Sequence, residues 1–149
     1  MITFETTEFI NRPPQEVFAF LSDPANYAKY QANTISAEWT SAGAPDVGST
    51  FKVLSKAPGG TTEVMMEVTI WAPPHRHGVQ SIKIPFPFKS AVGVTTLVPK
   101  ENGTQLTFHG EYVSIGIFQL VEAFLGKQIK QQDASNIRTM KQILEANVV

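Results

Sequence analysis

The feature that most constrains this chain is one long helical segment at its C-terminal end. Residues 116 to 147 contain no proline and are rich in Gln, Lys, Leu and Ala, which favour helices. Apolar side chains recur along this segment at Ile117, Leu120, Val121, Phe124, Leu125, Ile129, Ile137, Met140 and Leu144. Since no other segment predicts a helix of this length, we expect it to cover the apolar face of whatever sheet the chain forms.

The rest of the chain is predicted to be mostly strands. Residues 2–10 form a first strand, and Pro13-Pro14 and Asp23-Pro24 begin two short helices, because proline suits the first helical turn. Six more strands are predicted at 35–41, 48–55, 62–71, 75–84, 89–98 and 104–112. Short turns join them, which favours an antiparallel sheet. The expected fold is α+β: a seven-stranded, curved antiparallel sheet wrapped around the long C-terminal helix, in a single domain over residues 1–149.

Composition excludes several function classes. The formal net charge of −1 argues against binding to nucleic acid, which usually needs a clear basic excess. No run approaches the roughly 18 apolar residues of a membrane span, so we expect no stable membrane insertion. The N-terminus lacks a basic region followed by an apolar one, and the chain has no cysteine, so we expect a cytoplasmic protein.

Several short motifs resemble those of one known superfamily. They lie at residues 10–18, which read INRPPQEVF, and at 21–27, 47–51, 102–107 and 137–145. With them the whole chain resembles the START-like (SRPBCC) superfamily, which includes polyketide cyclase/dehydrase-like proteins and Bet v 1-type plant allergens. The resemblance implies a helix-grip fold with an internal cavity that binds a lipid, a polyketide or another small hydrophobic molecule. Only some members are enzymes, so the resemblance carries no catalytic residue to this chain.

The predicted faces of the strands and of the long helix indicate which side chains would line such a cavity. We expect the lining to include Phe51, Val53, Met66, Val68, Phe108, Tyr112, Leu120 and Phe124. The loop 84–88 holds two prolines and two phenylalanines, and we expect Phe86 and Phe88 to flank the opening as a lid. Tyr27 and Tyr30 are further candidates for offering a hydroxyl to the ligand. No cofactor is expected.

The histidines are candidates for a metal site. His75 and His77 would share one face of a strand and, with His109, would suit a metal. We favour a solvated strand end for the pair, and therefore predict no metal site.

An alternative function is that of a cyclase- or dehydratase-type enzyme acting on a hydrophobic, polyketide-like substrate. That chemistry needs an ionisable group inside the cavity, so the positions of the carboxyl groups decide whether this alternative holds. Glu111 is expected outside the cavity, whereas the face of Glu8 is ambiguous. A helical stripe continued from Ile129 passes near Asp133, although we favour a solvated stretch there. A protein-interaction module is a third alternative, in which the loop 84–88 meets a partner or a membrane surface, and a homodimer is possible.

Overall fold

The computed structural model describes residues 1–146, and Asn147, which we expected at the helix end, lies outside them. The first elements are strand β1 (Ile2–Ile10), helix α1 (Pro14–Leu21), the 3-10 helix η1 (Pro24–Asn26) and helix α2 (Tyr27–Tyr30). Strands β2 (Thr34–Trp39), β3 (Thr50–Ala57), β4 (Gly60–Ala72), β5 (Arg76–Lys83), β6 (Phe88–Lys100) and β7 (Gly103–Ser114) follow. The chain then forms the 3-10 helix η2 (Gly116–Val121) and helix α3 (Glu122–Ala146).

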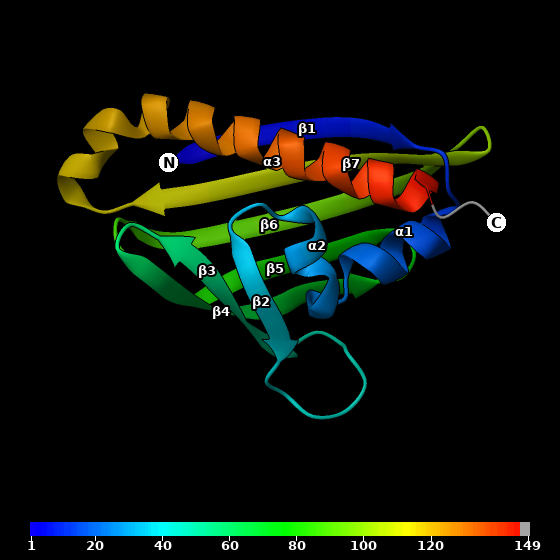
Figure 1. The fold of residues 1–149 in the computed structure, drawn as a ribbon, viewed down its shortest axis with the longest axis horizontal. Coiled ribbons are helices and arrows are strands. Elements are labelled where there is room, and N and C mark those ends of the chain that lie inside the picture. Colours follow the sequence, from blue (N-terminus) through cyan, green and yellow to red (C-terminus); the bar gives the residue numbers. More distant parts are fainter. Residues whose placement is uncertain (147–149) are drawn as a thin grey trace.

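All seven strands belong to one antiparallel sheet in the order β1-β7-β6-β5-β4-β3-β2, which confirms the predicted fold class. Figure 1 shows α3 running beside β1, with α1 and α2 packed near its C-terminal part. The pairing of β4 with β5 shifts register at two places, between Met65 and Met66 and between Val68 and Ile70. Such irregularities bend a strand, and here they help the sheet to curve toward the helices.

The C-terminal half of α3 fastens the helix to the sheet. Ile137, Met140 and Leu144 are buried and pack in the core. At the helix end, the carboxylate of Glu145 accepts a hydrogen bond from the backbone N–H of Asn11 at 3.1 Å. This half of the helix therefore has both apolar and polar ties to the N-terminal strand and to the residues that follow it.

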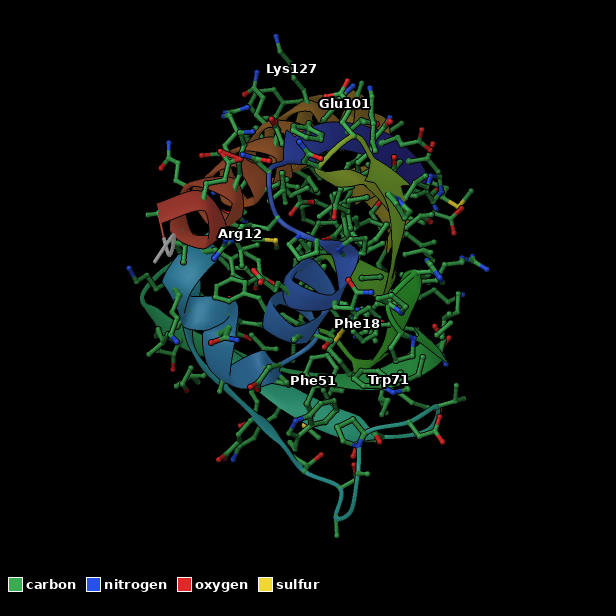
Figure 2. The ribbon with its side chains drawn as sticks, turned by 90° about the vertical axis from the view of Figure 1, so that its right-hand side faces the viewer. Arg12, Phe18, Phe51, Trp71, Glu101 and Lys127 are labelled. Atoms are coloured by element: carbon green, nitrogen blue, oxygen red, sulfur yellow. The ribbon has the colours of Figure 1, made fainter. Side chains whose placement is uncertain are left out.

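Residues of the core come from α1 and from strands far apart in the sequence. Figure 2 shows Phe18 of α1 on the same side of the molecule as Trp71 of the sheet, whereas Lys127 of α3 points away from the molecule. The rings of Phe18 and Trp71 meet edge to face with centroids 5.1 Å apart, which is a favourable aromatic geometry. Since α1 supplies Phe18, its packing fixes α1 over this part of the sheet.

The N-terminal part of the long helical segment differs from the prediction. Leu120 and Phe124 are 82% and 63% exposed, so their expected place in the cavity wall is wrong. Leu120 belongs to the 3-10 helix η2, whose about three residues per turn rotate side chains away from the positions that an α-helix would give them. Phe124 belongs to α3 itself, but its spacing from Ile137 places it on the side of the helix opposite to the buried face. Farther along, α3 packs on β1 through Gly126, where an added Cβ would lie 3.0 Å from Ile2.

Because Phe124 is exposed, truncating its side chain should cost little stability, unlike the truncation of a buried phenylalanine. We predict that Phe124→Ala lowers the free energy of unfolding by less than about 1 kcal/mol, as for other surface changes. Leu97→Ala, at a side chain that is only 2% exposed, should cost about 2–5 kcal/mol. Urea denaturation of the two variants measures both values. Equal losses would show that Phe124 is buried after all.

Candidate ligand-binding cavity

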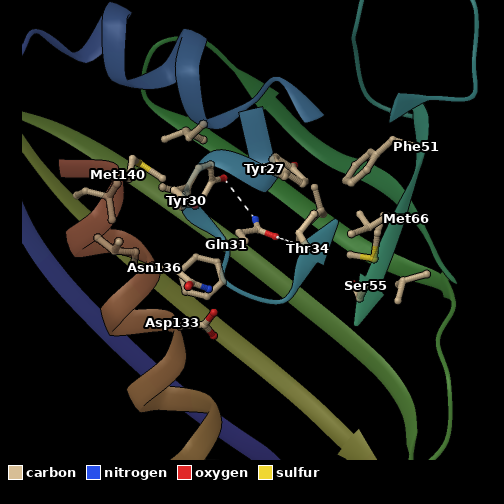
Figure 3. Close-up of a pocket in the computed structure, with 18 of the residues that line it drawn as sticks. Tyr27, Tyr30, Gln31, Thr34, Phe51, Ser55, Met66, Asp133, Asn136 and Met140 are labelled. Atoms are coloured by element: carbon tan, nitrogen blue, oxygen red, sulfur yellow. Dashed lines mark hydrogen bonds between the residues drawn. The ribbon is translucent and has the colours of Figure 1, made fainter. Parts of the chain in front are cut away.

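A cavity of about 260 Å³ lies between the sheet and helices α2 and α3 (Figure 3). Its walls come from α1, α2, the segment after α2, the six strands β2 to β7 and the middle of α3. The lining consists of Leu21, Tyr27, Tyr30, Gln31, Thr34, Phe51, Val53, Ser55, Val64, Met66, Val79, Thr95, Leu106, Phe108, Tyr112, Asp133, Asn136, Ile137 and Met140. Apolar side chains dominate it, which is typical of sites for small molecules.

The structure places the predicted lining residues in three different settings. Five of them face the cavity as expected, namely Phe51, Val53, Met66, Phe108 and Tyr112, and so do the candidate phenols Tyr27 and Tyr30. Val68 is fully buried but belongs to the core and not to the lining. Leu120 and Phe124 lie on the surface. Strand alternation thus found the sheet side of the cavity, whereas the long helix had to be corrected.

The loop 84–88 lies outside the lining. Phe86 is 69% exposed and packs edge to face on Phe118 of η2, with ring centroids 4.8 Å apart. Phe88 instead packs against Tyr112, with centroids 5.4 Å apart. Since Tyr112 lines the cavity, only Phe88 reaches the site, and it does so through that ring.

A polar group of side chains lies where the segment after α2 meets α3. The Thr34 hydroxyl donates a hydrogen bond to Gln31 Oε1 at 2.9 Å, and Gln31 Nε2 donates to the Tyr30 hydroxyl at 3.4 Å. Asn136 Oδ1 accepts from the backbone N–H of Ala32 at 3.2 Å. Figure 3 shows these side chains and Asp133 around the same space. The hydrogen-bond chain fixes the polar wall before any ligand arrives.

Asp133 is the feature of the cavity that sequence reasoning undervalued. Its Oδ2 atom is buried, and within residues 1–146 it has no hydrogen-bond partner. Burial raises the pKa of this carboxyl to about 6. Burial, and then the charge of Asp133, raise the pKa of the Tyr30 and Tyr112 hydroxyls. The expectation of a solvated stretch in the middle of α3 is therefore wrong at this residue.

Other sites that the sequence suggested do not form. His77 is buried against Phe18 and Trp71, and burial lowers its pKa to about 4, whereas His75 is exposed. The expected solvated strand end therefore holds only for His75. Nowhere in the described chain do three or more His, Cys, Asp or Glu residues gather in a way that would hold a metal ion.

The two other carboxylates weighed for catalysis are absent from the cavity lining. Glu8 lies 4.0 Å from the ammonium of Lys141, so β1 places it against α3. Glu111 lies 3.4 Å from His109, whose other ring nitrogen is 3.5 Å from Glu5. Asp133 is thus the only carboxylate among the lining residues that the structure describes.

Several lining residues escaped the sequence analysis although the sequence held a signal for some of them. Ser55 follows Phe51 and Val53 at strand spacing, and Val64 precedes Met66 by two residues. Asp133 lies four residues before Ile137 and seven before Met140, which is the spacing of one helix face. Gln31 lies between α2 and β2, outside any regular element, and no periodic pattern points to it.

Comparison with known proteins agrees with the fold and with the cavity. A family model described as polyketide cyclase/dehydrase and lipid transport matches residues 1–145. The chain belongs to this family. Comparison with curated proteins finds no match. None of the helices formed by residues 1–146 is both long and apolar enough to cross a membrane.

Solved structures of similar fold align with nearly the whole length of this chain. TTHA0849 from Thermus thermophilus aligns with a TM-score of 0.81 and 18% identity, over 99% of both chains. The Zhui aromatase/cyclase from Streptomyces sp. R1128 gives a TM-score of 0.82 and 14% identity, over 99% of this chain and 95% of that one. Ara h 8.0201 aligns with a TM-score of 0.77 and 16% identity, over 97% of this chain and 98% of that one. At such identities the likeness establishes the fold alone.

Because ionised Asp133 lacks a partner, it should destabilise the folded state. Its folded pKa of about 6 lies above the usual value near 4, so this destabilisation is complete above pH 6 and disappears as the pH falls toward 4. We predict that Asp133→Asn is more stable than the parent by up to about 3 kcal/mol at pH 7, and equally stable near pH 4. Urea denaturation at the two pH values measures the difference. A less stable variant at pH 7 would mean that the folded protein stabilises the charge.

Proposed function

We propose that this protein binds a small amphipathic molecule in the cavity between the sheet and α3. The single observation that carries the proposal is the composition of the lining, where apolar walls meet a few fixed polar groups and one carboxylate. Such a combination is typical of small-molecule sites, which hold the ligand by apolar burial and orient it by hydrogen bonds. Membership in a family described by lipid transport and polyketide chemistry supports the same proposal.

The size of the cavity limits the ligand. Its volume of about 260 Å³ lies just below the usual range for ligand sites, which starts near 300 Å³. This volume suits one small molecule with a short chain or fused rings and is too small for a phospholipid with two acyl chains. Phe88, through its contact with Tyr112, is the residue of the loop 84–88 that we propose to flank the entrance.

One observation favours a second candidate, a cyclase- or dehydratase-type enzyme. Asp133 has a pKa of about 6, so at neutral pH it exchanges protons readily and would serve as a general acid or base. The aromatase/cyclase Zhui shares the fold. The two candidates differ in one respect: turnover of a substrate would require the Asp133 carboxyl, whereas binding of a neutral apolar probe would survive Asp133→Asn.

The binding proposal predicts that filling the cavity blocks an apolar probe. N-Phenyl-1-naphthylamine is neutral and fluoresces when it leaves water, so we expect saturable fluorescence enhancement with the parent protein. Val64→Phe places a larger side chain in the cavity wall and should weaken binding of the probe at least about tenfold, since it fills the space that the rings of the probe would occupy. Fluorescence titration measures both dissociation constants.

Val98→Phe is the matched control, because it makes the same change on β6 at a side chain that is 52% exposed and outside the lining. It should bind the probe like the parent. A parent protein that does not enhance the fluorescence would overturn the proposed function. Equal weakening by both substitutions would place the probe outside the cavity.

A further inference from the structure

The structure points to a ligand class: we infer that the bound molecule carries a cationic amine at its polar end, and that Asp133 binds this amine. The inference rests on the proposed function and narrows it. It follows from the charge of the cavity wall, from the unmet hydrogen-bonding need of one oxygen, and from the aromatic residues beside it.

The wall carries one sign of charge. Among the lining residues of the described chain, Asp133 is the only one that carries a charge at neutral pH, since none of them is a Lys, Arg, His or Glu. Lys130, one turn earlier on α3, is exposed. A carboxylate in an apolar wall attracts a cation more strongly than one at the surface, because the low effective dielectric constant there weakens the interaction less. The same carboxylate repels a fatty acid or another anion.

Residues 1–146 supply no hydrogen-bond donor to one oxygen of Asp133. Asp133 Oδ2 is buried without a partner, although an ionised carboxylate needs donors. The Thr34 hydroxyl donates to Gln31, and the Gln31 amide donates to Tyr30, so these groups satisfy one another. A ligand that brings its own donor would meet the need of this oxygen. An ammonium group brings several N–H donors together with the charge that the carboxylate lacks.

Aromatic rings line the same part of the cavity. Tyr30 and Tyr112 lie close enough to Asp133 for its charge to raise their pKa, and both hydroxyls stay protonated. Tyr27 packs edge to face on Tyr30, with ring centroids 6.1 Å apart. The faces of such rings favour a cation over an anion, whereas a neutral alcohol would gain little from them. Tyr30, Tyr112 and the Asp133 carboxylate thus all favour a cation.

Three probes with the same chain and different heads test the inference. Octylamine, 1-octanol and octanoate are titrated as competitors of N-phenyl-1-naphthylamine at pH 8, where Asp133 is ionised. We expect octylamine, which is protonated at that pH, to bind about tenfold or more tightly than octanol, because a charge-assisted hydrogen bond replaces an unmet one. Octanoate should bind more weakly than octanol.

The pH dependence has a defined sign. The titratable groups that line the cavity from the other elements are Tyr27 and Tyr30 of α2 and Tyr112 of β7, and these stay neutral over the range used. With a pKa of about 6, Asp133 is mostly protonated at pH 5. The affinity for octylamine should therefore fall about tenfold from pH 8 to pH 5, that for octanoate should rise, and that for octanol should stay constant.

Asp133→Asn and Glu63→Gln separate the effect of the cavity carboxylate on binding from the effect of the protein's net charge. Both remove one negative charge, but Glu63 is exposed on β4 and outside the lining. Asp133→Asn should abolish the preference for octylamine over octanol and its pH dependence, while octanol binding shows that the variant is folded. Glu63→Gln should behave like the parent.

The outcomes are distinguishable. If the naphthylamine probe does not bind the parent protein, the proposed function itself fails. If the probe binds but the three competitors displace it equally, or octanoate is preferred at pH 8, the function stands and the amine inference is overturned. A preference for octylamine that survives in Asp133→Asn overturns it as well.

Discussion

One helix covers the concave face of a seven-stranded sheet, and the rest of the structure depends on how that helix is fastened. Ile137, Met140 and Leu144 hold its C-terminal half in the core, while its N-terminal part rests on β1 through Gly126. The middle of α3 therefore lies between two parts of the helix that pack on the rest of the protein. A single helix is too narrow to fill the space that a wide, curved sheet encloses, so the space beneath this middle part stays open and forms the cavity.

Among the polar residues of the cavity, Asp133 acts against stability and therefore indicates function. Tyr30, Gln31 and Thr34 satisfy one another by hydrogen bonds, whereas Asp133 has a buried oxygen with no partner in the described chain. Replacing such a carboxylate by a neutral group would cost the fold nothing and would remove an unfavourable charge. Functional sites commonly hold groups with perturbed pKa values that the fold alone does not need. A ligand that pairs with Asp133 would offset this cost.

The fold was predictable because its signals are local: strand alternation marks the strands, prolines mark the helix starts, and the absence of proline marks α3. Alternation also found Phe51 and Val53 in the cavity wall. Phe124 was misplaced because the predicted stripe joined two faces of one helix: Phe124 lies thirteen residues before Ile137 in α3, and at 3.6 residues per turn this spacing places it on the far side from the buried face. Asp133 was undervalued because a polar residue in a helix usually faces water, although its spacing from Ile137 places it on the buried face.

Methyl NMR of the four methionines tests most directly whether a ligand enters the space beneath α3. Met66 and Met140 line the cavity, whereas Met1 and Met65 lie outside its lining and serve as internal controls. Titration with N-phenyl-1-naphthylamine should shift the methyl signals of Met66 and Met140, since an aromatic ring in the cavity alters their magnetic environment, and should leave the other two in place. Shifts confined to Met1 and Met65, or no shift at any of the four, would contradict an internal binding site.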